Sequence, residues 1–562
     1  MHKVKIFFKL FFWLAVALWA ISLIGFFCKS DVDRVMPRWP LAYVRVDDPG
    51  AAVRGLMRMP GFDEGVLQGV HGNTTAAALT KWIVRCMAGR RAAIGLYHSV
   101  KADERVDILA VFDLGYTAEF FTRCYFSFLA LSDAPSVEHW KGVNILRMPG
   151  GSGLDFFVTQ HGGKVFVSND VYWVKRALSL RGFSPLQDSD YHKAFMRSRP
   201  PHTMFGAYAD TVRISQFMIV NEGRFLKAAA FLDPLIKDGI TLDGFERISL
   251  FGFSKSRHSL DLRLAADYDY EELSYVVSRY FERESKENHT LEYVPSTVDG
   301  YAWAGNVSPA FFWVLWANSI GEQQYGAFRQ KFFEKTGLDV EKDVVEALGS
   351  EYGAFGDLQG TLPRGVAFLS VKDAAAVNRV LDLIKTPTMH VQEYRGRSMQ
   401  VYDNFAGSFG IHPAYMFDGG RLWFASDVSA LIDVIDTKDK QRESFSKNPV
   451  FAADRLRVKD ASRTWCYAAV GRSADNAVRM AKSMMKQPQY AEALRTSFAS
   501  TGATAAQWED FKRGYALPIL KILRGIESAV FRLHTTDGRF TADVHLFFSS
   551  QQVKKGGDRE QS

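Results

Sequence analysis

An internal repeat is the feature that most constrains how this 562-residue chain can fold. A Gly-Gly pair at 162–163 is followed by Asp170, and a second pair at 419–420 is followed by Asp427, all at one offset of 257 residues. Gly-Gly between alternating apolar runs predicts a β-hairpin, because the turn requires positive φ. The Asp then predicts a helix N-cap. A constant offset through strand, turn and cap indicates a duplicated unit.

Each copy has the same predicted order of elements around this hairpin. It opens with a strand (41–46 or 301–304) and a helix, and closes with two further strands. In the second copy, Ser308-Pro309 predicts an N-cap with Pro at the first helical position. We therefore predict an α+β fold of two homologous domains, each a mostly antiparallel sheet with helices packed on one face. The predicted boundaries are 37–269 and 294–549, with a charged linker at 270–293 and a disordered tail at 550–562.

The N-terminus has the pattern of a membrane anchor, predicted over residues 1–29. Residues 10–27 form an uncharged run, LFFWLAVALWAISLIGFF, long enough with residues 6–8 to cross a hydrocarbon core of about 30 Å. Lysines precede the run and Asp31 and Asp33 follow it, which predicts a cytoplasmic N-terminus and a periplasmic or other extracytoplasmic chain. A cleaved signal peptide and a lipid-modified Cys28 remain alternatives.

The other cysteines are Cys86, Cys124 and Cys466. Cys86 and Cys124 would be able to pair in an oxidising compartment. Both lie in apolar helical patterns, which favours buried thiols.

Composition and motifs give no specific chemistry. The net charge of +7 is spread over the whole chain, which does not favour a nucleic-acid partner. The sequence contains no P-loop, HExxH or metal-ligand spacing, so we expect no cofactor and no metal. His192 and His202 flank basic residues and prolines, and we interpret them as surface-loop residues. No catalytic residue is assigned.

Two aromatic segments suggest a binding surface. One spans 120–129 and the other 311–316, and each is apolar on nearly all sides. A helix packed on both sides explains this pattern, but so does an apolar groove. The candidate groove residues are Phe120, Phe121, Tyr125, Phe311, Phe312 and Trp316.

The chain resembles the exported bacterial family known as domain of unknown function 3352. The resemblance rests on the Pro37-Arg-Trp-Pro40 entry, on Gly337-Leu338-Asp339 followed by Asp343 and Gly349, and on the segment from Tyr394 to Ser426. The first copy departs from this pattern at Gly89-Arg90-Arg91. The resemblance implies the fold and the compartment, and it carries no catalytic residues.

These observations leave three functions open. The first is a non-enzymatic, membrane-anchored envelope protein that binds or assembles with a partner. The second is a carrier or sensor of an apolar, lipid-like ligand held in the aromatic groove. A hydrolase is a lesser alternative, which would need a pocket with convergent polar groups.

Overall fold

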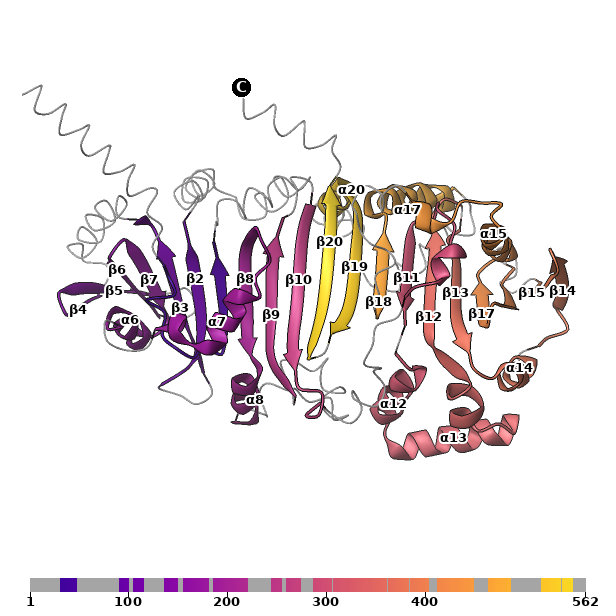
Figure 1. Ribbon diagram of the computed structural model, residues 1–562, viewed down its shortest axis with the longest axis horizontal. Helices are drawn as coiled ribbons and strands as arrows, with labels where there is room; N and C mark the ends of the chain where they lie inside the picture. Colours follow the sequence, from indigo (N-terminus) through magenta and orange to yellow (C-terminus); the bar gives the residue numbers. More distant parts are fainter. Residues whose placement is uncertain are drawn as a thin grey trace, which may run out of the picture. The chain divides into compact units, whose positions relative to one another are not determined.

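The computed structural model describes sixteen segments of the chain: 31–47, 90–100, 105–115, 136–149, 155–180, 185–220, 244–254, 259–273, 287–305, 307–360, 362–383, 385–403, 412–448, 463–486, 517–536 and 538–548. They belong to two compact units. Of the described residues, those up to 220 and 246–254 belong to the first unit, and 244–245 and those from 259 onward belong to the second. Each unit is built on one antiparallel sheet (Figure 1).

The first unit orders its strands β9-β8-β1-β2-β3-β7-β6-β5-β4. The strands are β1 (Ala42–Val46), β2 (Ala92–His98), β3 (Val106–Asp113), β4 (Ser136–Trp140), β5 (Val143–Pro149), β6 (Asp155–His161), β7 (Lys164–Ser168), β8 (Thr203–Asp210) and β9 (Phe245–Phe253). Helices α6 (Val171–Leu178) and α7 (Asp190–Arg197) pack on one face, where Val174 and Phe195 are fully buried. A 3-10 turn, η1 (Leu186–Asp188), precedes α7, and α8 (Thr211–Val220) follows β8.

Residues 31–37 lie on the same face of the first sheet as α6 and α7. Val32 and Met36 are fully buried in this core. Between them, Asp33 is 2% exposed and accepts hydrogen bonds from the Tyr43 hydroxyl and the Arg45 guanidinium. Nε2 of His192 lies 3.2 Å from an oxygen of the same carboxylate. The segment that follows the predicted anchor is therefore fixed to the sheet by both apolar and charged contacts.

His192 corrects our interpretation of the proline-flanked histidines as surface-loop residues. It lies in α7 and is 2% exposed, with its ring edge-on to Tyr43. The surface interpretation is wrong for this residue because α7 turns it toward the sheet, where Asp33 provides a buried partner.

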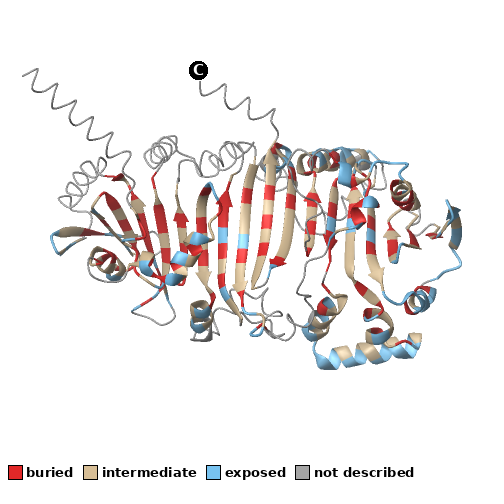
Figure 2. Cartoon of the chain, in the orientation of Figure 1, coloured by how far each residue is buried: buried red, intermediate tan, exposed pale blue. Residues whose placement is uncertain are grey.

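The second unit orders its strands β10-β20-β19-β18-β11-β12-β13-β17-β16-β15-β14. The strands are β10 (Ser259–Tyr268), β11 (Gly300–Ala304), β12 (Leu348–Asp357), β13 (Arg364–Val371), β14 (Met389–Tyr394), β15 (Arg397–Tyr402), β16 (Ala414–Asp418), β17 (Arg421–Ala425), β18 (Thr464–Ala468), β19 (Ile526–Thr536) and β20 (Arg539–Phe548). Buried and less buried residues alternate along most of them (Figure 2).

Helices lie on both faces of the second sheet. Helix α15 (Val428–Lys438) covers the main core, which includes Trp303, Trp423 and Trp465. Helix α14 (Ala374–Leu383) packs on the other face, against Tyr415 and Leu422. The prediction that helices pack on only one face is therefore wrong for the second sheet, because α14 packs on the face opposite α15.

Other short elements surround the second sheet. They are the 3-10 turns η2 (Thr290–Glu292) and η5 (Phe445–Lys447), the π-helix η3 (Val340–Val345), and helices α12 (Pro309–Ile320), α13 (Glu322–Thr336), α17 (Val470–Met485) and α20 (Leu517–Gly525). The last residues of the predicted linker belong to this core, because Leu291 and Tyr293 are 4% and 5% exposed.

The two units have the same connectivity. Strands β1 to β9 of the first sheet correspond in position to β11 to β19 of the second sheet. The number of each strand differs by ten from that of its counterpart. The turns and helix caps predicted from the sequence are also present. Both Gly-Gly turns have positive φ, and Asp170 and Asp427 each accept a hydrogen bond from the backbone N–H two residues later. The predicted α+β class and antiparallel sheet are confirmed.

The described part of the chain includes no helix that is long and apolar enough to cross a membrane. The predicted anchor at 1–29, the predicted tail at 550–562 and both Cys86 and Cys124 lie outside the described residues.

Candidate apolar binding face

The second sheet has one open face lined almost entirely by apolar residues. Side chains alternate across a strand, so the register identifies the residues that share this face. Three neighbouring rows cross β10, β20, β19, β18, β11, β12 and β13, and we call them the trough. The rows are Leu260-Leu546-Ala529-Ala468-Gly300-Gly356-Gly365, Leu262-Val544-Phe531-Cys466-Ala302-Ala354-Ala367 and Leu264-Ala542-Leu533-Thr464-Ala304-Tyr352-Leu369.

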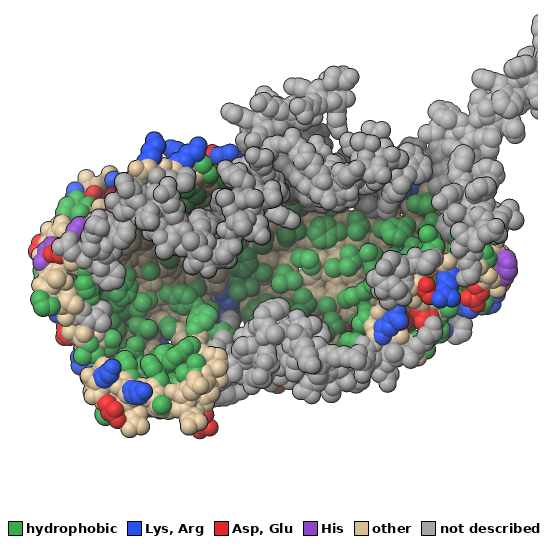
Figure 3. All heavy atoms as spheres, turned by 180° about the vertical axis from the view of Figure 1, so that it is seen from behind, with side chains coloured by type: hydrophobic (Ala, Val, Ile, Leu, Met, Phe, Trp, Pro, Cys, Tyr) green, Lys and Arg blue, Asp and Glu red, His purple; other side chains and the backbone are tan. Residues whose placement is uncertain are grey.

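The rows of the trough contain no charged side chain, yet much of their surface is accessible. Ala302, Ala354 and Ala367 are exposed, and Leu264 is 43% exposed. Seen from behind, this face is hollowed, and hydrophobic side chains cover its floor (Figure 3). The solvated face of an antiparallel sheet is ordinarily polar. An exposed apolar face of this extent marks a surface that binds something apolar.

Charged groups lie on the opposite face of the same strands. Asp261 and His545 form a buried hydrogen-bonded pair between β10 and β20. Next to them, Nε of Arg263 donates to Asp543 at 2.7 Å. The strands β10 and β20 thus turn their charges away from the trough and their leucine and valine side chains toward it.

Helices stand at the ends of the strands that form the floor (Figure 1). At one end, α12 brings Phe312 edge-on to Tyr352 of the floor, with ring centroids 6.1 Å apart. At the other end, α17 packs against α20 and β19. Beside β13, helix α14 and its cluster cover the continuation of the same face.

The structure places three of the six predicted groove residues, all on α12. Phe311 is 8% exposed and belongs to the packed side of the helix, whereas Phe312 and Trp316 are 51% and 39% exposed. Trp316 packs on Trp313, with ring centroids 4.9 Å apart. Phe120, Phe121 and Tyr125 lie outside the described residues, so their part of the predicted groove stays a prediction.

Two glycines in the floor have no packing reason to be glycine. A Cβ added to Gly365 would meet only the Phe355 carbonyl oxygen, at 4.0 Å, and one added to Gly300 only the Tyr467 oxygen, at 3.7 Å. Glycine weakens a strand interior and often marks a place where another molecule approaches the backbone. Both glycines lie in one row with Gly356 and Ala468, which leaves that part of the floor free of large side chains.

Titratable groups of the floor remain neutral. Burial raises the pKa of Tyr352 to about 12. Burial also raises the pKa of the Cys466 thiol. Cys466 lies in the middle row of the floor and is a free thiol. Neither group supplies a charge to the trough near neutral pH.

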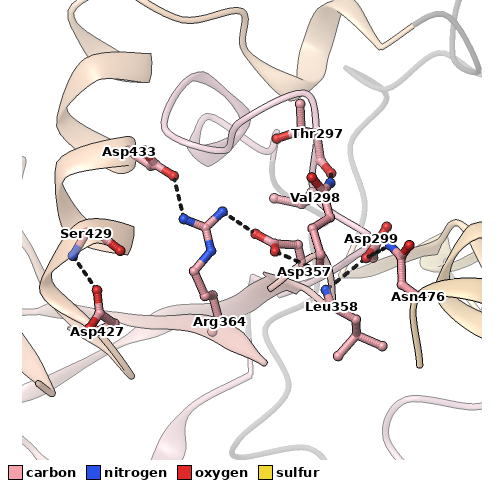
Figure 4. A network of polar contacts seen from close by, with 12 residues as sticks. Thr297, Val298, Asp299, Asp357, Leu358, Arg364, Asp427, Ser429, Asp433 and Asn476 are labelled. Carbon is pink, nitrogen blue, oxygen red and sulfur yellow. Dashed lines mark hydrogen bonds and ion pairs between the residues drawn. The ribbon is translucent and has the colours of Figure 1, made fainter. Parts of the chain in front are cut away.

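A polar network holds the other parts of this unit together (Figure 4). Arg364 donates to Asp357 at 2.8 Å and to Asp433 of α15 at 3.3 Å. Burial raises the pKa of Asp433 although Arg442 and Arg364 flank it. The pocket beside this network encloses only about 20 Å³, room for about one water molecule. We interpret these contacts as structural.

Asp299 connects α17 to the strands (Figure 4). This carboxylate is 3% exposed. It accepts hydrogen bonds from the backbone N–H of Leu358 at 2.9 Å and from the Asn476 amide at 2.8 Å. Nε of Arg472 donates to it at 2.6 Å. This buried carboxylate therefore adds polar contacts to the packing of α17 against α20 and β19.

The first unit has a corresponding apolar face. One row runs Leu250-Ala207-Val44-Ile94-Ala110, and the next runs Ile248-Ala209-Ala42-Leu96-Ile108. Leu250 and Ile108 are 36% and 42% exposed. Where the second unit has Gly300, Gly356 and Gly365, this face has larger side chains, including Leu96 and Ile108.

Sequence reasoning missed the floor residues. The strand Leu260-Asp-Leu-Arg-Leu264 alternates apolar and charged residues, a pattern that predicts apolar residues toward the core and charged residues toward solvent. The structure reverses this arrangement. The available signal was that nearly every strand has apolar residues on the face opposite its large aromatic residues, as in Gly-Tyr-Ala-Trp-Ala at 300–304.

Comparisons with known proteins add no argument about function. No family model matches the chain, and no curated protein matches it. Among solved structures, crystal form III of TP0453 is 13% identical, with a TM-score of 0.26, and the match covers 45% of this chain and 86% of that one. Crystal form I of TP0453 is 11% identical, with a TM-score of 0.23, over 43% and 80% of the two chains. Similarity this low establishes neither fold nor function.

Proposed function

We propose that this chain is a membrane-anchored, extracytoplasmic envelope protein that binds the acyl chains of a lipid-like ligand in the trough. The observation that carries the proposal is the exposed, uncharged floor of the second sheet, with charged residues confined to the opposite face of β10 and β20. A sheet face with this distribution needs an apolar cover.

The dimensions of the trough suit a lipid chain. Seven strands about 4.8 Å apart span about 29 Å, whereas one acyl chain spans half of a hydrocarbon core, about 15 Å. Each CH₂ group removed from water contributes up to about 0.8 kcal/mol, so contact with the apolar floor favours binding without a polar anchor. The exposed Ala302 and Ala354 and the unobstructed Gly365 leave the backbone accessible to such a chain.

This interpretation is favoured over the two other functions that the sequence leaves open. A protein-assembly surface typically combines an apolar centre with a polar rim and hydrogen-bonding groups. The trough rows offer only the Thr464 and Tyr352 hydroxyls and the Cys466 thiol as polar side-chain groups. For a hydrolase, the pocket beside Arg364 has no room for a substrate.

The compartment and the origin of the two units belong to the same proposal. The apolar run at 10–27 supports a single-pass anchor in the inner membrane with the bulk of the chain outside the cytoplasm. The shared strand order supports an origin by duplication, and the sequence motifs support membership of the family known as domain of unknown function 3352. A second lipid-binding face in the first unit would follow from the duplication.

Native mass spectrometry of the full-length chain tests the ligand. Ala302→Lys with Ala354→Lys places two charges on exposed floor positions without burying them in the core. The matched control is Ala375→Lys, an exposed alanine of α14 in the same unit. We expect lipid adducts on the wild type and the control, and fewer on the double variant.

The control also accounts for lipids that bind the predicted anchor, because all three proteins retain it. Equal adduct numbers on the double variant and the control would contradict the proposal. If the double variant carries fewer adducts, organic extraction of the material bound to the wild type identifies the ligand.

A further inference from the structure

The segment that follows the predicted anchor is held against the first sheet from its first described residue. Oδ1 of Asp31 lies 3.6 Å from Nη1 of Arg45, and the same guanidinium donates to the buried carboxylate of Asp33. Between them, Val32 is fully buried in the core of the first unit. Contacts with the sheet therefore set the position of Asp31.

These contacts lie at one end of the strands. Arg45 is the next-to-last residue of β1, and its Nε donates to Asp47 at 3.0 Å. Asp47 in turn lies 2.7 Å from Nη2 of Arg199, and its backbone N–H donates to the Met204 carbonyl at 2.9 Å, near the start of β8. We call this end of the first sheet, with Asp31, Asp47 and Arg199, the tether end.

The covalent chain limits how far the tether end can be from a membrane. Three residues, 28–30, separate the apolar run at 10–27 from Asp31. Four extended residue-to-residue steps span at most about 14 Å. The headgroup layer on each side of the hydrocarbon core is about 5–7 Å thick, so Asp31 lies within about 10 Å of its outer boundary. A lipid on Cys28 would leave one residue fewer and impose a tighter limit.

The charges at the tether end are compatible with an anionic surface. Asp31 and Asp33 both lie within ion-pair distance of Arg45, so neither faces the headgroups as an unpaired charge. Arg197 ends α7 two positions before Arg199, and it is exposed. A cation close to an anionic leaflet contributes about 1 kcal/mol to the attraction.

We infer that the tether end of the first unit contacts the surface of an anionic lipid bilayer, while the other end of the same strands lies farther from it. Strand β8 (Thr203–Asp210) runs from the tether end to α8 and covers about 23 Å along its axis. This orientation rests on the anchor that forms part of the proposed function. It does not depend on the trough.

The test compares two exposed helix sites at opposite ends of β8. A fluorescent amino acid replaces Arg197 of α7 in the full-length chain, and the control replaces Val212 of α8, which is 55% exposed. The protein is reconstituted in vesicles of phosphatidylcholine and phosphatidylglycerol that contain a lipid with a spin label on its headgroup as quencher. Flotation isolates the protein that is bound to vesicles.

We expect quenching at 197 and no more than background at 212, because about 23 Å separate the two ends of β8. A flexible Gly-Ser linker of about twenty residues, inserted after Ser30, spans about 25 Å and should remove the quenching at 197. The free energy of unfolding should not change. His202 and Val100, both exposed and also at opposite ends of the sheet, repeat the comparison if the first variants do not fold.

The outcomes separate this inference from the proposed function. Protein that floats with equal quenching at 197 and 212 would overturn the orientation and leave the anchor and the trough. Quenching at 197 that survives the linker would contradict the tether as its cause. Protein that does not float would contradict the anchor and the orientation together, whereas the lipid adducts that depend on Ala302 and Ala354 test the trough separately.

Discussion

Asp33 shows how a single buried charge can hold a terminal segment on a sheet. Burial opposes its ionisation, but the hydrogen bond with His192 and the positive charge of Arg45 outweigh this, and the pKa of Asp33 lies below its ordinary value. The carboxylate is thus ionised in the folded chain and neutralises a guanidinium that is itself only 4% exposed.

Removing the charge of Asp33 should be strongly destabilising. Asp33→Asn leaves Arg45 buried without its closest counter-charge, so the free energy of unfolding should fall by about 3–5 kcal/mol. Asp190→Asn is the control, because the Asp190 side chain is 94% exposed and its change should stay within about 0.5 kcal/mol. Denaturant titration compares the two, and equal losses would refute the role of Asp33.

The same residue predicts a pH dependence. A carboxyl whose pKa is lower in the folded than in the unfolded chain stabilises the fold above its ordinary value of 3.8 and loses this contribution as the pH falls through the folded value. The difference in unfolding free energy between the wild type and Asp33→Asn should be constant near neutral pH and narrow below 3.8. A difference that widens in acid would contradict this assignment.

At the scale of elements, two glycines, one in β12 and one in β13, differ in the space that a side chain would find. A Cβ on Gly353 would lie 2.5 Å from the Ala302 carbonyl oxygen and 2.6 Å from the Phe368 ring, whereas Gly365 has open space. Gly353 is therefore required by packing, and Gly365 is not. Under the proposed function, Gly365 leaves room for the ligand over this part of the floor.

Alanine substitution should separate these two glycines. Gly353→Ala should lower the free energy of unfolding by about 1–3 kcal/mol through overpacking. Gly365→Ala should leave it unchanged or raise it by up to about 1 kcal/mol, because glycine is unfavourable in a strand. Thermal unfolding of both variants decides this, and a loss at Gly365 as large as at Gly353 would show that packing requires both.

The Asp299 carboxylate contributes buried hydrogen bonds that hold helix α17, in addition to its packing against α20 and β19. Asp299→Ala leaves the Asn476 amide and the Leu358 N–H without their acceptor, so a loss of about 3 kcal/mol is expected, with faster hydrogen exchange in α17. Asp475→Ala is the matched control, because this residue is 55% exposed and forms a surface ion pair with Arg524. Unchanged exchange in the Asp299 variant would contradict the account.

Turns and caps were predictable from sequence because each is a local requirement. The Gly-Gly turns, the Asp170 and Asp427 caps and the Ser308-Pro309 helix start all occur where the residues indicated. The sequence did not predict which face of β10 and β20 packs against the core. Alternation shows which residues share a face, but it does not show which of the two faces is buried. The pairing of strands that are distant in the sequence decides which face is buried.

At the scale of the whole molecule, the two units share one strand connectivity but differ in the residues of their apolar faces. Both units order their strands in the same way, and both have an apolar face opposite the main core. Their floors differ most where Leu96 and Ile108 correspond to Gly356 and Gly365. We therefore expect the second unit to hold the larger ligand.

Photo-crosslinking in intact cells shows whether a lipid occupies the trough. A benzophenone amino acid replaces Ala354 in the floor of the trough, and the control replaces Ala375 on α14, both exposed in the same unit. After irradiation of cells that contain the full-length chain, we expect a lipid-mass adduct at position 354 and none above background at 375. A protein adduct at 354, or lipid adducts equal at both positions, would contradict it.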